Sequence, residues 1–419
     1  MKVLILGQGA REHAIARQFS KSTLIRGLAA AGGNAGIADL GRIHPAVSPE
    51  NAAAVIALVR ETKSDLVFVG PEAPAAAGTV DALKKAGIPV IGPDKNAARL
   101  ESSKVFSKEF MTRHHIPTAE AVSFTEAAAF SAHIKAQAGK KLVVKKSGLA
   151  AGKGVLESAD QEELLSFGNN ILSSDAVLVE EFLEGWEVSI FALGDGAHYR
   201  LLAPCTDYKK AHDNDRGPNT GGMGSVSPVP WVDDALMARI ETEVVAPTFR
   251  GLAADGIFYT GVVYFGLMIT AQGPKLLEYN VRFGDPEAQV LLPRITTDFG
   301  KIAIAMTESR LDKLPIDISP RAAAGVVVAA DGYPGSYQKK LPVAPIEAPP
   351  EEEALIFHAS TLLDPDGDKV LTNGGRCFTV VGFGENLEEA ARTAYRYVDR
   401  VRFSGARHRT DIGRKFFSS

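Results

Sequence analysis

Short apolar runs alternate with longer amphipathic stretches over the first hundred residues of the chain. The runs span residues 3–6, 66–69 and 90–91, and each ends in a Gly or Gly-Pro turn. Apolar runs of this length, separated by stretches long enough for a helix, predict βαβ units and a parallel sheet. Ligands of such sheets bind beyond the carboxyl ends of the strands. A ligand is therefore expected near three loops, residues 7–9, 32–36 and 70–72.

From residue 104 the chain follows a different alternation. The pattern predicts a helix at 104–114 and a strand at 142–145, then a glycine-rich connection, a helix near 161–170 and a strand at 177–181. Helical and strand periodicities in short segments divided by glycines indicate a small α+β unit. A longer mixed region follows over residues 188–310.

The last hundred residues predict one more small α/β domain. Strands are expected at 325–329, 355–358 and 378–381, and a helix at 387–401. A chain of 419 residues is too long for one hydrophobic core, so several domains are expected. We therefore predict a multidomain protein of the α/β and α+β classes with a parallel sheet in its N-terminal domain.

Composition and charge exclude several classes of protein. The hydrophobic content of 45% and the charged content of 23% are typical of a soluble globular protein. The net charge of -4 and the lack of a Lys/Arg-rich run argue against a nucleic-acid-binding protein. No run has the apolar length of a membrane span. Cys205 and Cys377 lack a metal-binding spacing, and two distant cysteines are typical of reduced thiols in a cytoplasmic protein.

The motif LLEYNVRFGDPE at residues 276–287 is the strongest chemical signal in the sequence. If its apolar start is a strand, Glu278 and Asn280 point to the same face, because side chains alternate with a period of two. A carboxylate and an amide oxygen suit Mg²⁺, which in turn usually holds nucleotide phosphates. The alternative is that both residues cap a turn. The charged residues that follow, Arg282, Asp285 and Glu287, would be an unusual cluster without a cation or an anionic ligand, and they favour metal binding.

Two glycine-rich segments are candidates for binding phosphates. KKSGLAAGKG at residues 145–154 follows a predicted strand, and it carries Lys145 and Lys153, the latter between Gly152 and Gly154. Such a loop can close over phosphates with its N–H groups pointing inward. The spacing is not that of a Walker A loop, and the alternative is a solvated hairpin. The second segment is PNTGGMG at residues 218–224.

Two weaker signals lie at turns that follow predicted strands. Gly7-Gln8-Gly9 begins like a dinucleotide fingerprint, but the third glycine is replaced by Glu12, so NAD binding is not expected. Anion binding by Gly9 and the neighbouring Arg11 stays open, with an unliganded tight turn as the alternative. The segment EEFLEGWE at residues 180–187 could offer backbone groups to an adenine and a carboxylate to a ribose, although acidic residues after a strand are usually solvated.

Taken in order along the chain, these motifs resemble the ATP-grasp superfamily. Within it, the sequence resembles the phosphoribosylamine–glycine ligase (glycinamide ribonucleotide synthetase) family of purine biosynthesis over residues 1 to about 411. The motifs that carry the resemblance are VLILGQGAREHA, GGNAG, VGPEAP, LESSKVFSKEF, GLAAGKGV, DRGPNTGGMG and YNVRFGDPEAQ. The pair PNTGGMG and RFGDPE is highly specific. Gly266 stands where many ATP-grasp enzymes have an acidic metal ligand, a feature that this family shares.

The resemblance implies an N-terminal α/β domain, an interrupted ATP-grasp domain, its small lid and a C-terminal α/β domain. We expect these domains at residues 1–103, at 104–121 with 190–320, at 122–189 and at 321–419. A monomer is expected, with a dimer as the alternative.

The resemblance also implies roles for individual residues. It implies that the ATP phosphates contact Lys104, Lys145, Lys153, Gly152 and Gly154. It implies that Glu180 and Phe182 frame the adenine, that Glu187 binds the ribose, and that Glu278 and Asn280 bind Mg²⁺ or Mn²⁺. The residues expected around the reacting groups are Arg282, Asp285 and Asp213. The residues expected to line the substrates are Asn219 and Thr220 for glycine, and Glu72, Asn34, Gly9 and Arg11 for the ribosylamine.

The activity implied by the resemblance is the ATP-dependent joining of glycine to 5-phosphoribosylamine through glycyl phosphate. Its partners are ATP, glycine and 5-phosphoribosylamine. The lack of a nucleophile motif agrees with a reaction that needs no covalent enzyme intermediate. Two alternatives stay open. One is another ATP-grasp ligase of purine synthesis that uses formate or bicarbonate, and the other is a non-catalytic ATP-binding subunit.

Overall fold

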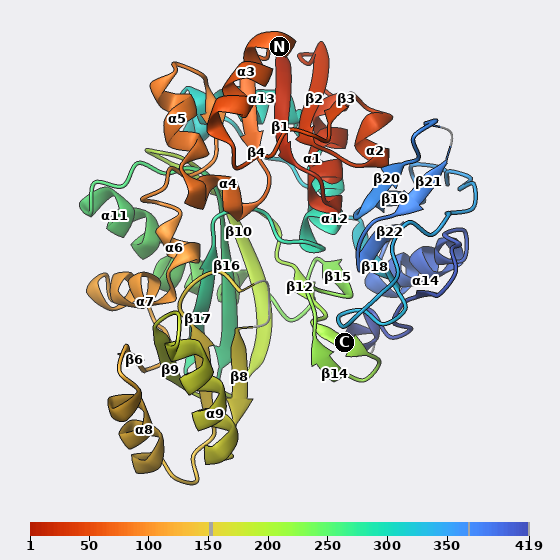
Figure 1. Ribbon diagram of the computed structural model, residues 1–419. Helices are drawn as coiled ribbons and strands as arrows, with labels where there is room; N and C mark the ends of the chain where they lie inside the picture. The colour runs from red at the N-terminus through yellow and green to blue at the C-terminus, as the bar shows by residue number, and fades with distance from the viewer. Residues whose placement is uncertain (151–153, 368, 418–419) are drawn as a thin grey trace.

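The computed structural model describes residues 1–150, 154–367 and 369–417. The chain forms four regions, with the N-terminal region at the top of Figure 1 and the C-terminal region at the right. Among the described residues no helix combines the length and the apolar character that crossing a membrane requires. The predicted fold class, a multidomain α/β and α+β protein with a parallel N-terminal sheet, is confirmed.

The N-terminal region is a five-stranded parallel sheet with strand order β3-β2-β1-β4-β5. Its elements are β1 (Lys2–Gly7), α1 (Ala10–Ser20), β2 (Gly27–Gly32), α2 (Ala35–Ala38), β3 (Arg42–His44), α3 (Ala52–Thr62), β4 (Leu66–Val69), α4 (Glu72–Ala77), α5 (Thr79–Lys85) and β5 (Val90–Ile91). The apolar residues of β1 and β4 are buried on both faces, as expected of a sheet covered by helices. The three predicted apolar strands are therefore confirmed.

The second region contains a small four-stranded antiparallel sheet with strand order β6-β9-β7-β8. Its elements, with the two preceding helices, are α6 (Arg99–Ser102), α7 (Lys104–Arg113), β6 (Ala121–Phe124), α8 (Ala127–Ala136), β7 (Leu142–Lys146), β8 (Val155–Ser158), α9 (Gln161–Leu172) and β9 (Val177–Glu181). Helix α7 begins where the Ser103 side chain accepts the Phe106 N–H, an N-cap of the usual kind. We call the part from β6 to β9 the lid.

The third region is built on a four-stranded antiparallel sheet with strand order β11-β10-β16-β17. Its elements are β10 (Trp186–Asp195), β11 (Tyr199–Leu201), β12 (Thr206–Asp207), β13 (Lys210–His212), β14 (Arg216–Asn219), β15 (Gly224–Ser227), α10 (Asp234–Ile240), the π-helix η1 (Glu241–Val245), α11 (Ala246–Ala254), β16 (Thr260–Thr270), β17 (Gly273–Asn280), α12 (Glu287–Leu291), η2 (Leu292–Arg294), α13 (Phe299–Thr307) and η3 (Leu311–Lys313). Strands β13 and β14 form a separate hairpin.

The C-terminal region contributes most of a second large sheet, with strand order β12-β15-β18-β22-β19 and β23 paired to β18. Its elements are β18 (Ala322–Ala330), β19 (Ala354–His358), β20 (Thr361–Leu363), β21 (Val370–Thr372), β22 (Arg376–Gly384), α14 (Leu387–Val398), β23 (Ala406–Arg407) and η4 (Arg414–Phe416). Helix α14 ends three residues before the predicted limit, because the N–H groups of Arg400 and Val401 bond three residues back instead of four.

This sheet crosses the predicted domain boundary at residue 320. Strands β12 and β15 lie before that boundary in the sequence, and β15 pairs antiparallel with β18 over Gly224 to Ser227. Hydrophobic periodicity shows where a strand lies but not which strand it pairs with, so the sequence could not reveal this crossing. The glycine-rich segment 218–224, called the glycine loop below, consequently leads straight into the C-terminal sheet.

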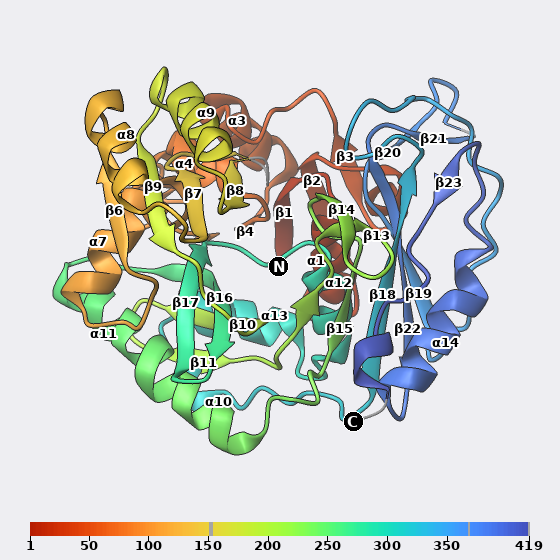
Figure 2. The same cartoon turned by 90° about the horizontal axis from the view of Figure 1, so that it is seen from below.

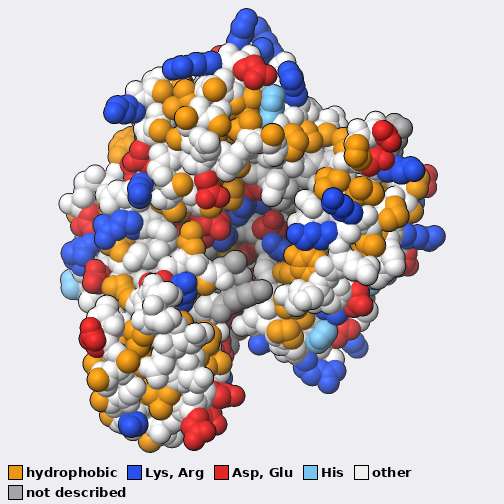
Figure 3. All heavy atoms as spheres, in the orientation of Figure 1, with side chains coloured by type: hydrophobic (Ala, Val, Ile, Leu, Met, Phe, Trp, Pro, Cys, Tyr) orange, Lys and Arg blue, Asp and Glu red, His pale blue; other side chains and the backbone are white. Residues whose placement is uncertain are grey.

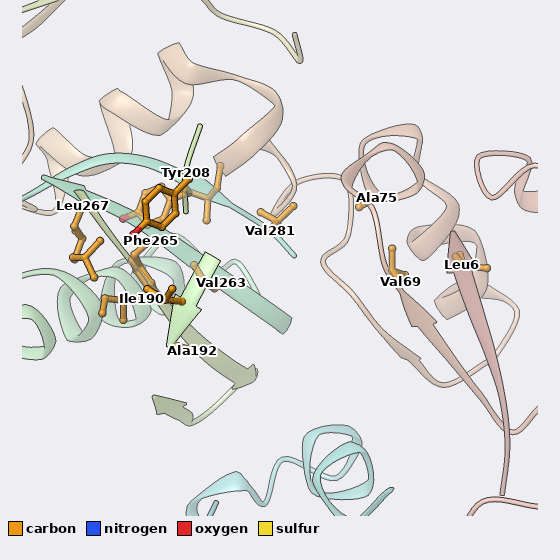
Figure 4. Close-up of a cluster of buried hydrophobic side chains, with 14 of the residues drawn as sticks. Leu6, Val69, Ala75, Ile190, Ala192, Tyr208, Val263, Phe265, Leu267 and Val281 are labelled. Carbon is orange, nitrogen blue, oxygen red and sulfur yellow. The ribbon is translucent and has the colours of Figure 1, made fainter. Parts of the chain in front are cut away.

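The lid has a hydrophobic core of its own, whereas the other three regions share theirs. One buried cluster joins Leu6 of the N-terminal sheet, Phe265 of the central sheet and Phe378 of the C-terminal sheet, and Figure 4 shows its N-terminal and central members. The lid instead packs around a separate cluster that includes Phe130 and Val144. Figure 2 shows the lid, in yellow, and the C-terminal region, in blue, on opposite sides of the molecule.

Candidate active site

A hollow in the middle of the face shown in Figure 3 is lined by Lys, Arg, Asp and Glu side chains. The end of strand β17 supplies Glu278 and Asn280 on one face of the sheet, as the strand period predicts. Glu278 pairs with Gly266 of β16, where a Cβ would lie 3.3 Å from the Glu278 Cγ. The lack of a side chain at Gly266 therefore leaves room for the glutamate.

The Glu278 carboxylate makes no hydrogen bond or ion pair with the residues that the structure describes. Asn280 is buried, and its Oδ1 accepts a hydrogen bond from Arg282 Nη2 at 2.9 Å. Two oxygen ligands on one face fit Mg²⁺, which takes its other ligands from phosphates and water. No group of three or more His, Cys, Asp or Glu residues suited to a metal occurs in the described part of the chain. Glu278 and Asn280 are therefore the candidate metal ligands on this face.

Arg282 is enclosed by carboxylates from two other segments. Its Nε lies 3.3 Å from Glu72 Oε2 at the start of α4, and its Nη2 lies 2.9 Å from Glu101 Oε1 on α6. Burial disfavours the charged guanidinium, but these two carboxylates hold the pKa of Arg282 above its ordinary value. The pKa of Glu72 is lowered, because Arg282 and Arg11 outweigh the burial of its carboxyl. Glu101 lies in the LESSK motif but was not among the expected site residues.

Asp285 lies between the Gly7-Gln8-Gly9 turn, called the first glycine turn, and the C-terminal region. A Cβ on Gly9 would stand 3.3 Å from Asp285 Oδ2, and Arg376 Nη1 lies 3.4 Å from its Oδ1. Although burial alone would raise it, Arg376 and Arg11 hold the pKa of the Asp285 carboxyl below its ordinary value. Gln289 Nε2 donates to the same carboxylate at 2.9 Å. The side chain is therefore a fixed anion at neutral pH.

Glu12 fills the interior of the first glycine turn. Its Oε2 accepts the Gly9 N–H and its Oε1 accepts from Arg11 Nε, both at 2.6 Å. A Cβ on Gly70 would come within 2.3 Å of the same carboxylate. Arg11 is buried, and its Nη1 donates to the Phe283 carbonyl at 3.0 Å. The side chains of Glu12 and Arg11 thus brace the turn, which agrees with the absence of a dinucleotide fingerprint.

Lys145 on β7 and Lys108 on α7 share the buried carboxylate of Glu180. The Nζ–Oε distances are 2.7 Å for Lys145 and 2.9 Å for Lys108. Burial opposes the charge, but Glu180 and Glu278 hold the pKa of Lys145 above its ordinary value. The pKa of Glu180 is lowered by both lysines against the effect of burial. Glu180 therefore faces lysine ammonium groups, and the sequence analysis had not anticipated Lys108.

Lys104 begins helix α7, and its Nζ donates to the carbonyl oxygen of Gly148 at 3.4 Å. Burial lowers the pKa of this lysine. Gly154 ends the loop, where its carbonyl accepts the Lys146 N–H at 2.8 Å. Gly152 and Lys153, the other two residues expected at the phosphates, lie outside the described residues.

Phe182 and Glu187, which were expected near the adenosine together with Glu180, also each contact a lysine. Lys141 Nζ lies over the ring of Phe182, 3.5 Å from its centroid. Glu187 forms an ion pair with Lys209, and this lysine lowers the pKa of the Glu187 carboxyl. Lys209 is therefore a further charged residue at this side of the hollow, and no motif singled it out.

The β13–β14 hairpin and the glycine loop carry the residues expected to bind glycine. Asp213 accepts hydrogen bonds from the backbone N–H of Thr410 at 2.8 Å and from its Oγ1 at 2.5 Å. Asp213 thus bonds to the C-terminal tail, and among the described residues it makes no hydrogen bond or ion pair with Arg282. Asn219 is exposed, whereas Thr220 is buried and its hydroxyl donates to the Lys209 carbonyl at 2.8 Å.

Asn34 holds the N-terminal and C-terminal regions together. It is buried, and its Oδ1 accepts the Ile37 N–H at the start of α2. Its amide nitrogen donates at 2.9 to 3.2 Å to four carbonyl oxygens, those of Gln8, Gly9, His358 and Ala359. Both polar atoms of the Asn34 side chain thus bond to backbone groups of the protein, and two of these groups belong to the first glycine turn.

The chain matches three family models in succession. They are the phosphoribosylglycinamide synthetase N domain over residues 1–101, the ATP-grasp (A) domain over 102–288 and the C domain over 323–415. Together these models cover most of the chain. The same ATP-grasp region contains Lys104, Lys145, Glu180 and Glu278.

Relatives of known name match the chain over its full length. A phosphoribosylamine–glycine ligase of Agrobacterium fabrum is 45% identical and covers 99% of this chain and 98% of its own. The Streptomyces coelicolor protein of the same name is 44% identical over 99% of both chains. A crystal structure of phosphoribosylamine–glycine ligase from Thermotoga maritima has a TM-score of 0.86 at 34% identity, and covers 98% of this chain and 100% of that one. A biotin carboxylase from Campylobacter jejuni, at 16% identity and a TM-score of 0.73, shares the fold alone.

Proposed function

We propose that this chain, which belongs to the phosphoribosylglycinamide synthetase family, joins glycine to 5-phosphoribosylamine and converts ATP to ADP and phosphate in the same reaction. The observation that carries the proposal is the full-length match, in which all three domains of the family follow one another in one chain at up to 45% identity to named ligases. We infer a role in purine biosynthesis in the cytoplasm.

A carboxylate is a poor electrophile, so the reaction needs two displacements. A glycine carboxylate oxygen attacks the γ-phosphorus of ATP, and ADP leaves. The amine nitrogen of phosphoribosylamine then attacks the acyl carbon of glycyl phosphate, the carbon–oxygen bond to phosphate breaks, and the nitrogen loses a proton. No covalent bond to the enzyme forms. Catalysis is therefore a matter of positioning the substrates and neutralising charge.

We assign the triphosphate to the side of the hollow formed by β7, β17 and α7. Lys145 and Lys104 supply positive charge there, and Glu180 keeps Lys145 ionised and oriented. Glu278 and Asn280 are the candidate ligands of Mg²⁺ or Mn²⁺, which when bound neutralises phosphate charge. This assignment is favoured because, among the described residues, the Glu278 carboxylate makes no hydrogen bond or ion pair and raises the pKa of the nearby Lys145.

We assign the amine-binding side to Asp285, Glu72 and Arg282. The lowered pKa values of Asp285 and Glu72 make both carboxylates poor bases but good partners for an ammonium group. We therefore propose that Asp285 holds the amino group of glycine or of the ribosylamine. Arg282, held between Glu72 and Glu101, neutralises developing phosphate charge.

The test is phosphate release from MgATP in the presence of glycine and freshly generated phosphoribosylamine. Release is expected only when both are present. In Glu278→Gln it should fall by roughly two orders of magnitude, the usual scale for a lost electrostatic contact with the transition state. Glu109→Gln, on the exposed face of α7, is the matched control and should keep full activity. Release that depends on formate or bicarbonate instead of glycine would assign the chain to a different ligase reaction.

A further inference from the structure

Two side chains of the C-terminal region, those of Arg376 and Tyr333, form hydrogen bonds with the glycine loop. Arg376 Nη1 donates to the carbonyl oxygens of Gly221 at 2.6 Å and Gly222 at 3.3 Å. The same nitrogen donates to the Asp285 carbonyl at 2.6 Å. The hydroxyl of Tyr333 accepts the Gly221 N–H at 3.0 Å. One guanidinium and one phenol therefore join the glycine loop to the segment that carries Asp285.

The close fit at this junction depends on missing side chains. A Cβ on Gly375 would lie 2.1 Å from the Tyr333 ring, and one on Gly221 would lie 3.1 Å from the Arg376 Cζ. Gly222 has a φ of +111°, and a Cβ there would lie 2.4 Å from Pro286. Gly374 and Gly375, which precede β22, Arg376 at its start and the two glycines of the loop thus fit together without room for larger residues.

Arg376 lies in a paired strand, and Tyr333 lies in a turn whose backbone accepts a side-chain hydrogen bond. Arg376 is the first residue of β22, which pairs with β18 along almost its whole length. The Tyr333 carbonyl accepts a hydrogen bond from Arg407 Nη2 at 2.9 Å. Because β15, which follows the glycine loop, belongs to the same sheet, both ends of this contact are fixed by backbone pairing.

We propose that Arg376 and Tyr333 are positioning residues of the ligase reaction. They hold the glycine loop and the backbone at Asp285 in the arrangement that binds glycine and phosphoribosylamine, the two substrates that carry an amino group. This proposal rests on the proposed function and extends it to the C-terminal region, to which the sequence analysis assigned no site residue. The contacts of the two side chains do not include Lys145, Glu180 or Glu278 among the described residues, so the nucleotide side should be independent of them.

The kinetic test compares Tyr333→Phe and Arg376→Lys with Tyr397→Phe. Tyr397 is the matched control, because its hydroxyl donates to the Glu353 carboxylate at 2.6 Å on the outer side of the C-terminal region. We expect kcat/KM for glycine and for phosphoribosylamine to fall about tenfold in Tyr333→Phe and on the order of 100-fold in Arg376→Lys, as small misplacements of reacting groups do. The KM for ATP should stay within about twofold, and the control should behave as wild type.

A second measurement does not depend on activity. Hydrogen exchange of the peptide that spans residues 218–224 should accelerate in Tyr333→Phe, because the Gly221 N–H loses its acceptor, and stay unchanged in Tyr397→Phe. Unchanged exchange would show that the contact does not hold the loop. Faster exchange with unaltered substrate constants would overturn the positioning role.

The outcomes also separate this proposal from the proposed function. A wild-type enzyme that releases no phosphate with glycine and phosphoribosylamine would refute the ligase assignment, while the exchange data would still report on the contact. If the constants for ATP, glycine and phosphoribosylamine all worsened together with the melting temperature, the two side chains would be structural supports of the whole fold. That result would reject the specific role proposed for them.

Discussion

At the scale of single residues, Asn34 shows how one buried amide can join two regions of the chain. Sequence resemblance placed it at the ribosylamine. Its amide nitrogen lies 2.9 to 3.2 Å from four carbonyl oxygens of the two terminal regions, and its role at the ribosylamine stays a prediction. Buried acceptors that lose their donor cost more free energy than a hydrogen bond contributes on average. Asn34 is thus expected to matter for stability as well as for the shape of the glycine turn.

The substitution Asn34→Asp should lower the free energy of unfolding by about 3 kcal/mol, because a carboxylate would face carbonyl oxygens in a buried site. The matched control is Asn51→Asp. Both asparagines cap a helix through Oδ1, at α2 and α3, but Asn51 is exposed. Aspartate is as good an N-cap as asparagine, so the control should be nearly neutral. Urea unfolding of both variants checks this, and equal losses in the two would contradict it.

At the scale of elements, the lid joins the rest of the molecule through charged groups more than through its core. Its apolar cluster is closed within itself. The carboxylate of Glu180 on β9 meets Lys145 on β7 within the lid and Lys108 on α7 outside it. Such a lid can be held in place by a few ion pairs while its interior stays intact. This arrangement suits a segment that closes over a nucleotide and excludes water from the acyl phosphate.

The substitution Glu180→Gln should reduce the free energy of unfolding by about 3 kcal/mol, because it leaves two buried ammonium groups without their counter-charge. It should also raise the KM for ATP more than that for glycine. Glu181→Gln is the control in the same strand. The partly exposed Glu181 pairs with Lys275 at 3.1 Å, and such pairs contribute only about 0 to 1 kcal/mol. Thermal unfolding and substrate titrations distinguish the two, and similar effects in both variants would argue against the shared carboxylate.

At the scale of the whole molecule, the N-terminal and C-terminal regions meet through two histidines. His13 on α1 accepts the backbone N–H of His358 on β19 through its Nδ1 at 2.9 Å, and the two rings lie 5.8 Å apart. Burial and the neighbouring His358 lower the pKa of His13 to about 3, and burial lowers that of His358 to about 4. Both rings are therefore neutral in the folded protein at physiological pH.

This contact predicts how stability depends on pH. The unfolded chain binds protons at histidine near its ordinary pKa of about 6.5, whereas folded His13 does not until about pH 3. The unfolded state therefore binds more protons between these values. Stability should fall with decreasing pH by up to about 1.4 kcal/mol per pH unit for this group.

The variant His13→Asn keeps an acceptor near the position of Nδ1 and removes the titration. We expect its free energy of unfolding between pH 6.5 and 4.5 to decline less steeply than that of wild type, by about one proton in the linkage slope. The exposed His115, whose φ of +54° asparagine tolerates, gives the control His115→Asn. Slopes that match in wild type and His13→Asn would mean that the buried ring does not govern acid unfolding.

The succession of elements could be predicted from the sequence, because periodicity and turn residues are local signals. Strands β1, β4 and β5, helix α7 and the lid strands β7 and β9 lie where the pattern indicated. The shared face of Glu278 and Asn280 followed from the strand period alone. The resemblance carried by the glycine loop and RFGDPE led to the family, and with it to the ATP-grasp fold and the proposed reaction.

Only the tertiary structure decided which of these residues meet. Glu101 and Arg282 lie 181 positions apart in the sequence, and the hydrogen-bonded Arg376 and Gly221 lie 155 positions apart. No local pattern encodes such pairs, since side-chain periodicity fixes a face but not the partner across it. The sequence by itself therefore determined the elements, the family and the candidate chemistry. The tertiary structure decided which carboxylates neutralise which cations. A charged group that becomes buried needs an opposite charge beside it, and here that partner is distant in the sequence.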